Sequence, residues 1–117
     1  MDLRAWVTLR GPTKREWAAD LGADAVFETG RIPPEPVNRV IETVVTATWQ
    51  HSLDSVGRRI VVSGITTCAM LSADLLAVLA KGVTVQGSVM GTGEDPALLA
   101  AFVERRGRRW LCTGYFA

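Results

Sequence analysis

The sequence is poor in the residue types that build metal centres and disulfide scaffolds. Among its 117 residues it has two cysteines, Cys68 and Cys112, and one histidine, His51. The two cysteines form neither a C-x-x-C pair nor a zinc-ribbon spacing. We therefore predict free, reduced thiols, as is usual in the cytoplasm, and we expect no zinc in this chain.

Charge of one sign and long apolar runs are also lacking. The 13 Lys and Arg against 12 Asp and Glu give a formal net charge of +1. This balance removes the broad electrostatic attraction to nucleic acid or to an anionic membrane. The longest apolar region, residues 69–90, is interrupted by Asp74, Lys81 and Gln86 and is too broken for a membrane span. Since the N-terminus also lacks the apolar core of a signal peptide, we expect a cytoplasmic protein that binds neither nucleic acid nor membranes.

Catalytic constellations are missing as well. Ser63 and Ser88 lack the G-x-S-x-G turn and the partner base that activate a serine nucleophile. His51 has no neighbouring cysteine or aspartate cluster in the sequence, and we interpret it as a surface or packed residue. We therefore predict no catalytic residue in this chain.

What the sequence does contain is an alternation of short β-branched runs and amphipathic segments. About half of the residues (48%) are hydrophobic, which at this length indicates one α/β domain. We predict strands at residues 4–9, 25–28, 39–44, 59–63 and 83–90, with a short helix as the alternative at 39–44. Such alternation is typical of a mostly parallel sheet with helices on both faces.

Helix ends are predicted from their capping residues. Thr13 and Glu16 have capping-box spacing, and Thr46 or Thr48 opens the next helix. Ser72 is the expected cap of the third helix, which Gly82 ends. The last helix begins at Asp95 and carries an apolar stripe that we expect to be buried, formed by Leu98, Leu99, Phe102 and Val103.

Four segments, in order along the chain, now point to one family. They are RAWVTLRGPTKREWAADLGADAVFETGR (4–31), VIETVVTATWQHSLD (40–54), RIVVSGITT (59–67) and VTVQGSVMGTG (83–93). Together they resemble the cofactor-binding domain of medium-chain dehydrogenases/reductases, specifically zinc-type alcohol dehydrogenases and the related NADPH:quinone oxidoreductases. The resemblance implies a partial Rossmann-type three-layer sandwich, a partial NAD(P)-binding domain over residues 1–107, and a divergent tail at 108–117.

Two parts of that family's domain are missing from this sequence. It contains no G-x-G-x-x-G, the turn that places a pyrophosphate on a helix N-terminus, and it lacks the strand before that turn. In the strand order 3-2-1-4-5-6 the missing strand lies in the middle of the sheet. Three outcomes are open: direct pairing of the strands at 4–9 and 39–44, a partner chain that fills the gap, or marginal stability. We expect direct pairing.

The resemblance also implies where a nucleotide binds. Arg10, Lys14 and Arg15 correspond to positions near the adenosine ribose, where basic side chains favour the 2′-phosphate of NADP. The alternative is a solvated start of a helix.

The nicotinamide side of the implied site is formed by residues at the end of the 59–63 strand and on the last strand. Gly64, Ile65 and Thr66 border the nicotinamide ribose in the family, Ser88 and Met90 pass the carboxamide, and Thr43 completes the contacts. Ligands in open α/β sheets bind beyond the carboxyl ends of the strands. An ordinary strand-to-helix turn is the alternative at Gly64.

A complete relative transfers a hydride between NAD(P)H and a carbonyl, alcohol or quinone. We expect this chain alone to do so inefficiently, because it lacks the pyrophosphate turn and the substrate domain. The alternative function is a non-catalytic module that forms a homodimer through the edge strand Val83 to Met90. A different doubly wound domain, such as a methyltransferase core, is a third interpretation.

Overall fold

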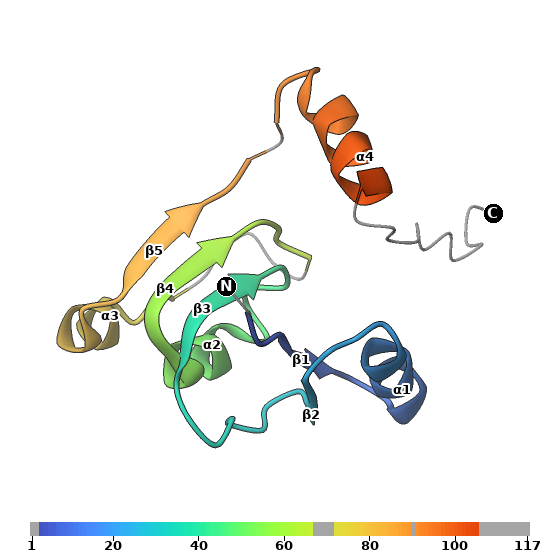
Figure 1. The fold of residues 1–117 in the computed structure, drawn as a ribbon. Helices are drawn as coiled ribbons and strands as arrows, with labels where there is room; N and C mark the ends of the chain where they lie inside the picture. The colour runs from blue at the N-terminus through green and yellow to red at the C-terminus, as the bar shows by residue number, and fades with distance from the viewer. Residues whose placement is uncertain (1–2, 67–71, 90, 106–117) are drawn as a thin grey trace.

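A computed structural model describes residues 3–66, 72–89 and 91–105 (Figure 1). The elements are β1 (Trp6–Leu9), α1 (Pro12–Asp20), β2 (Ala25–Glu28), β3 (Val37–Glu42), α2 (Trp49–Ser55), β4 (Val56–Val62), α3 (Leu75–Lys81), β5 (Thr84–Gly87) and α4 (Asp95–Arg105). Met90, both cysteines and the predicted tail at 108–117 lie outside the described residues.

The strands form two separate sheets, and every pairing in them is parallel. β1 pairs with β2, while β3, β4 and β5 form a three-stranded sheet in that order. This arrangement of parallel strands and helices confirms the predicted fold class of a partial Rossmann-like domain.

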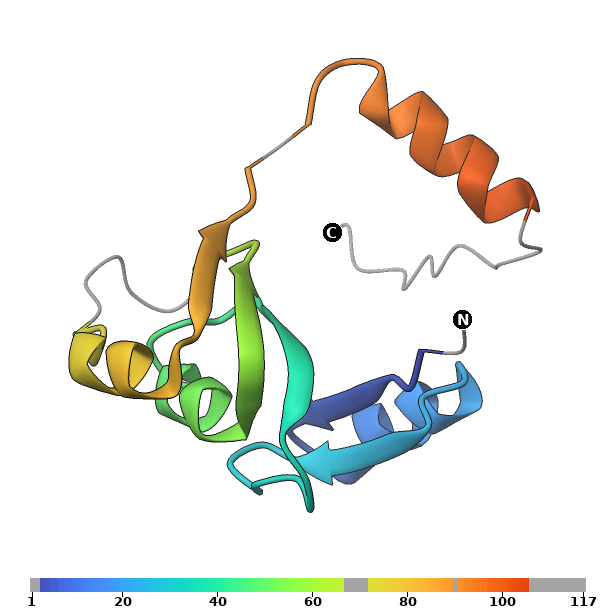
Figure 2. The ribbon, with the colours of Figure 1, turned by 60° about the vertical axis from the view of Figure 1, so that its left-hand side comes forward.

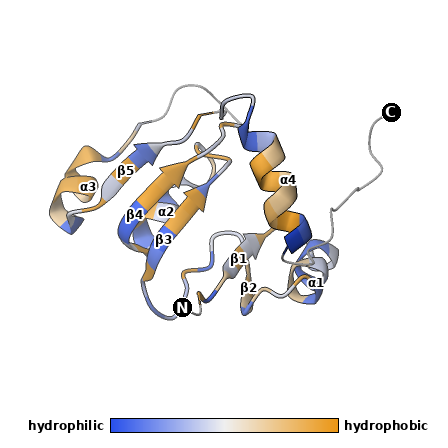
Figure 3. Cartoon of the chain, turned by 45° about the horizontal axis from the view of Figure 1, so that its top comes forward, coloured by the Kyte–Doolittle hydropathy of each residue, from blue (hydrophilic) through white to orange (hydrophobic). Residues whose placement is uncertain are grey.

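The predicted direct pairing of the first strand with the third is wrong. Within the described residues, β1 pairs only with β2, and β3 pairs only with β4. Each sheet is held by its own helix, since α1 contacts β1 and β2 whereas α2 contacts β3 and β4. Across the molecule the strands follow one another in the order β5, β4, β3, β1, β2 (Figures 1 and 3). The two sheets therefore meet where the order of a doubly wound sheet requires one more strand.

The core lies under one face of the larger sheet. Val40 and Val62 of the sheet and Ala77 and Val78 of α3 pack against a buried cluster there. The buried apolar cluster consists of Trp49, Leu53, Val56, Ile60 and Val83. On the opposite face, Ile41 of the outer strand β3 is 75% exposed.

The predicted buried stripe on the last helix is wrong. α4 begins at Asp95 as predicted, but it has no buried residue. Its apolar side chains Leu98, Leu99 and Phe102 are exposed. α4 extends away from both sheets (Figure 2). Helical spacing specifies which side chains share a face but not whether another element covers that face.

Two predicted caps are also wrong. α1 begins at Pro12 after Gly11, with no side-chain cap, so Thr13 lies inside the helix rather than before it. Proline favours the first helical position because its missing N–H needs no partner there. In α3 the capping residue is Asp74, not Ser72, and its carboxylate accepts from the Ala77 N–H at 2.9 Å.

The predicted ends of α3 and β3 lie at or within two residues of the observed ends. Gly82 ends α3 with a left-handed φ of 61°, as predicted. β3 ends at Glu42, two residues earlier than predicted.

Within the described residues, no helix combines the length and apolar character needed to cross a membrane.

Candidate functional site

The carboxyl ends of β3, β4 and β5 lie side by side at one edge of the larger sheet (Figure 1). Hydrogen bonds continue the ladder beyond the strands: the Ser63 N–H donates to the Glu42 carbonyl at 2.9 Å, and the Ser88 N–H donates to the Val62 carbonyl at 2.8 Å. Parallel strands bring their carboxyl ends to the same edge. Three of the predicted cofactor residues therefore lie just beyond the ends of neighbouring strands. Thr43 directly follows β3, Ser88 directly follows β5, and Gly64 lies two residues after β4.

Gly64 lies very close to the backbone of Thr43, which follows the neighbouring strand. A β-carbon placed on Gly64 would lie 3.2 Å from the carbonyl oxygen of Thr43. Only glycine fits this spacing without displacing the neighbouring backbone. The adjoining side chains of Thr43, Ile65 and Thr66 are exposed. At this end of the sheet, the backbone is closely packed between Gly64 and Thr43, while the nearby side chains face solvent.

A buried carboxylate organises the loop behind this edge, and the sequence-based analysis did not identify it as a site residue. Glu42 is only 3% exposed. Its Oε1 accepts from the N–H groups of Val44 and Val45 at 2.9 and 3.0 Å and from the Thr48 hydroxyl at 2.7 Å. Its Oε2 accepts from the Ser52 hydroxyl. The carboxylate thereby ties the end of β3 to the first turns of α2.

These hydrogen bonds decide the charge state of Glu42. Burial acts to raise its pKa, but the donors Ser52, Thr48, Val45 and Val44 outweigh burial and hold the pKa below its ordinary value of 4.5. The loop also contains Val45 at a φ of +72°, a conformation that costs energy in a β-branched residue. Glu42 accepts from the Val45 N–H and so holds the strained residue in place. The only sequence signal was a carboxylate at a strand end followed by hydroxyl residues at spacings of six and ten.

The basic residues predicted near the adenosine ribose form a second group on the smaller sheet. Arg10 follows β1, and Lys14 and Arg15 lie in the first turn of α1. The Arg15 guanidinium donates to the Leu9 carbonyl at 3.4 Å, so it is turned back toward the strand. Among the described residues, the exposed side chains of Arg10 and Lys14 have no hydrogen-bond or ion-pair partner. These two cations are accessible to an anionic ligand.

The predicted site residues thus fall into two groups. The structure brings Thr43, Gly64, Ile65, Thr66 and Ser88 to one edge of the larger sheet. It places the three basic residues on the smaller sheet, beyond the position of the missing strand. Nothing can be assigned at Met90, which lies outside the described residues.

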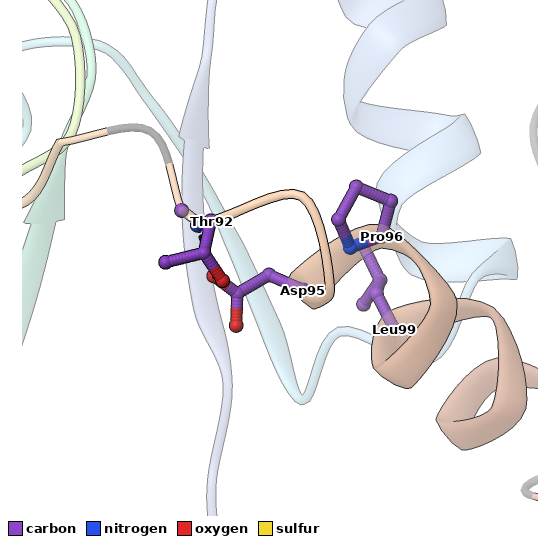
Figure 4. A pocket seen from close by; sticks show the side chains of 5 residues that line it. Thr92, Asp95, Pro96 and Leu99 are labelled. Atoms are coloured by element: carbon purple, nitrogen blue, oxygen red, sulfur yellow. Dashed lines mark hydrogen bonds between the residues drawn. The ribbon is translucent and has the colours of Figure 1, made fainter.

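The Gly91-Thr-Gly93 turn precedes α4 and forms an open pocket of about 370 Å³ (Figure 4). The pocket is lined by Gly91, Thr92, Asp95, Pro96 and Leu99. The N–H and the hydroxyl of Thr92 both donate to the Asp95 carboxylate. Because the Asp95 carboxylate already accepts from both donors of Thr92, Thr92 does not offer them to a phosphate.

Metal-ligating side chains are not gathered in the described parts of the chain. Residues 3–66, 72–89 and 91–105 contain no group of three or more His, Cys, Asp or Glu side chains placed to hold a metal ion. The single histidine lies instead with its Nε2 2.9 Å from the Arg31 carbonyl oxygen.

Comparison with known proteins identifies the fold. No protein-family model matches the sequence, and no curated protein matches it. Solved structures do match. The protein AibC superposes with a TM-score of 0.79 at 21% identity, over 91% of this chain and 33% of its own. The described chain therefore has the fold of about a third of AibC.

Two further structures of this fold agree. An NAD-dependent alcohol dehydrogenase matches with a TM-score of 0.75 at 18% identity, over 88% of this chain and 34% of its own. YhdH from E. coli K-12, solved with bound NADPH, matches with a TM-score of 0.66 at 18% identity, over 86% of this chain and 34% of its own. The chain thus spans about a third of the length of the alcohol dehydrogenase-like structures that it matches.

Proposed function

We propose that the chain is a fragment of an NAD(P)(H)-binding domain of the zinc-type alcohol dehydrogenase and quinone oxidoreductase kind. The observation that carries this proposal is the edge at which Thr43, Gly64 and Ser88 follow neighbouring parallel strands. In open α/β sheets, the carboxyl ends of the strands form the ligand-binding side. The NADPH bound to YhdH, whose fold this chain shares in part, supports a dinucleotide as the ligand.

The residues present fit the two ends of a dinucleotide but not its centre. Thr43, Thr66 and Ser88 supply hydroxyl groups at the nicotinamide end, beside the closely packed backbone of Gly64. Arg10 and Lys14 suit the 2′-phosphate of NADP at the adenosine end. For the pyrophosphate there is no G-x-G-x-x-G turn, and Asp95 takes the N–H and the hydroxyl of Thr92 at Gly91-Thr-Gly93.

The bound nucleotide would supply hydride-transfer chemistry, with a carbonyl, alcohol or quinone as the second substrate. The role of this chain is to position the two ends of that nucleotide. We propose that the chain alone turns over such substrates inefficiently, because its sequence has no pyrophosphate turn.

Isothermal titration of the whole chain with NADPH and with NADH tests the proposal. The double variant Arg10→Ala/Lys14→Ala should weaken NADPH binding about tenfold or more and leave NADH binding unchanged, since only NADPH carries the 2′-phosphate. Arg58→Ala/Arg59→Ala removes the same charge from exposed positions on β4 and should change neither affinity. Absence of binding for both nucleotides would refute the proposal, and equal losses for both in the first variant would refute the assignment of the cations.

A second candidate function is a dimerisation module, and one observation favours it. Every residue of β5 is exposed, and β5 pairs only with β4 in the described sheet. The opposite edge of β5 therefore offers backbone donors and acceptors to a second copy. Light scattering after size-exclusion chromatography would detect a dimer that is indifferent to nucleotide. A monomer at all concentrations would exclude this role.

A further inference from the structure

We propose that α4 pairs antiparallel with α4 of a second copy of this chain. The proposal rests neither on nucleotide binding nor on the edge of β5. α4 extends away from both sheets (Figure 2), and it has no buried residue among those that the structure describes. Its apolar side chains Leu98, Leu99 and Phe102 are 65%, 54% and 49% exposed. Contiguous exposed apolar surface of this kind marks a site of protein contact.

One face of α4 carries the apolar residues together with two opposite charges. Helical spacing places five side chains within about 120° of one another around the helix axis. They are Asp95, Leu98, Leu99, Phe102 and Arg105. Figure 3 shows the apolar middle of the helix in orange between hydrophilic ends in blue. The order along this face is therefore negative, apolar, positive.

This order is complementary to its own reverse. The pattern is centred on Ala100: Asp95 and Arg105 lie five residues to either side of it, and Leu98 and Phe102 lie two residues to either side. An antiparallel helix centred on the same residue places Asp95 opposite Arg105 of the second copy and Leu98 opposite its Phe102. Each contact then occurs twice, as a two-fold symmetric interface requires. A second copy of α4 therefore fits this face in both shape of pattern and charge.

The two charges cannot neutralise each other within one copy, because ten residues of α-helix span about 15 Å. The Arg105 Nε donates to the Ala101 carbonyl at 3.2 Å, which leaves its terminal N–H groups without a partner among the described residues. Oδ2 of Asp95 accepts from Thr92, which leaves Oδ1 for a further donor. A guanidinium–carboxylate pair between two copies uses these remaining groups.

The open pocket at the start of α4 lies beside the same face (Figure 4). Asp95 and Leu99 belong both to this face and to the pocket lining, and Pro96 extends the apolar part of the lining. In the antiparallel pair, Phe102 of the second copy lies next to Leu98, at the mouth of the pocket. The pairing thus provides an apolar occupant for the pocket as well as a cation for Asp95.

α3 also has exposed leucines, but it lacks this self-complementary pattern. Leu76 and Leu79 are more exposed than the apolar residues of α4. The charges at the ends of α3 are used within the chain, since Asp74 caps its start and Lys81 donates to the Leu53 carbonyl. α3 therefore provides the control for exposed leucine without complementary charge.

The first test is the self-association of the whole chain. A helix pair of this size belongs to the small, transient interfaces, so we expect a dissociation constant of roughly 10–500 μM. Sedimentation equilibrium across that concentration range measures it. Leu98→Ala/Phe102→Ala should raise the constant about tenfold or more, because it removes the apolar centre of the pair. Leu76→Ala/Leu79→Ala should leave it unchanged. Alanine favours helix, and circular dichroism verifies that both variants retain it.

Charge reversal tests the antiparallel arrangement itself. Asp95→Arg brings two cations together at each end of the pair, and Arg105→Asp brings two carboxylates together, so each variant alone should be monomeric. An equal mixture of the two variants restores opposite charges at both ends. The mixture should therefore associate about tenfold or more tightly than either variant alone. Mixing folded variants without any gain would contradict the pairing.

The native chain decides the question if the variants lose their helix. In a mixture of ¹³C-labelled and unlabelled native chains, NOEs between copies should join Leu98 to Phe102, and their absence would overturn the inference. So would a monomer throughout the concentration range, which leaves α4 to another occupant. Association that survives both charge reversals would also overturn it, and is the result expected of a dimer formed through β5. The experiments contain no nucleotide, so their outcome is separable from that of the proposed function.

Discussion

Gly64 lies against Thr43 so closely that an added β-carbon would be 3.2 Å from the Thr43 carbonyl oxygen. The two residues follow neighbouring strands, β4 and β3, and their contact sets the spacing of the candidate binding edge. The obstacle to a larger residue is backbone and not a flexible side chain, so relief requires movement of the strand end itself.

Gly64→Ala should lower the free energy of unfolding by about 1–3 kcal/mol, because the new methyl group must displace the Thr43 carbonyl. Gly87→Ala is the matched control, since a β-carbon there has no atom within 4 Å. Urea denaturation of both variants makes the comparison. Equal destabilisation by the two substitutions would contradict the close packing at Gly64.

Glu42→Gln should destabilise the fold by about 1–3 kcal/mol, since it weakens four hydrogen bonds to a buried carboxylate. Glu94→Gln, at an exposed position just before α4, provides the control and should cost little. Thermal unfolding measures both changes. A Glu42→Gln variant as stable as the native chain would show that the carboxylate does not organise the loop.

Acid should selectively remove the contribution of Glu42. Its pKa is lower in the folded state than the ordinary 4.5, so the unfolded chain binds the proton more tightly. The stabilisation is therefore fully present above about pH 4.5 and is lost as the pH falls through the lower pKa of the folded state. Denaturation at a series of pH values should show the gap between native and Glu42→Gln proteins narrowing below that point. A constant gap down to pH 3 would be inconsistent with the lowered pKa.

Leu53 of α2, at the centre of the small core, should be far more sensitive to truncation than an exposed leucine of α3. Leu53 is fully buried, and Leu53→Ala should cost about 2–5 kcal/mol. Leu76→Ala removes the same atoms from a side chain that is 75% exposed and should change stability by less than about 0.5 kcal/mol. Chemical denaturation distinguishes these results. Similar losses at both positions would mean that α3 is covered in solution by something outside the described residues.

Local features of the fold could be predicted from the sequence. The β-branched run around Ile60 indicated β4, Gly82 indicated the end of α3, and Asp95 followed by Pro96 indicated the start of α4. Each of these signals acts within a few residues along the chain, where backbone sterics and capping decide the structure.

Features that depend on distant parts of the chain could not be predicted. The apolar spacing of α4 indicated a stripe, but whether Phe102 is buried depends on which element lies opposite. The failure of β1 to pair with β3 depends on the packing of two separate helices. The role of Glu42 emerges only when the loop folds back and brings Ser52 to it. The two groups of candidate site residues were predicted, but their separation on two sheets was not.

Residue-resolved NMR during titration with NADPH tests the central claim most directly, because it reports where a nucleotide meets the chain. The account predicts shifts of the amide resonances of Gly64, Thr66 and Ser88 at the carboxyl edge and of Arg10 beside β1, with Leu76 and Leu79 on α3 unchanged. Shifts confined to α3 or α4, or no shifts at millimolar NADPH, would contradict it.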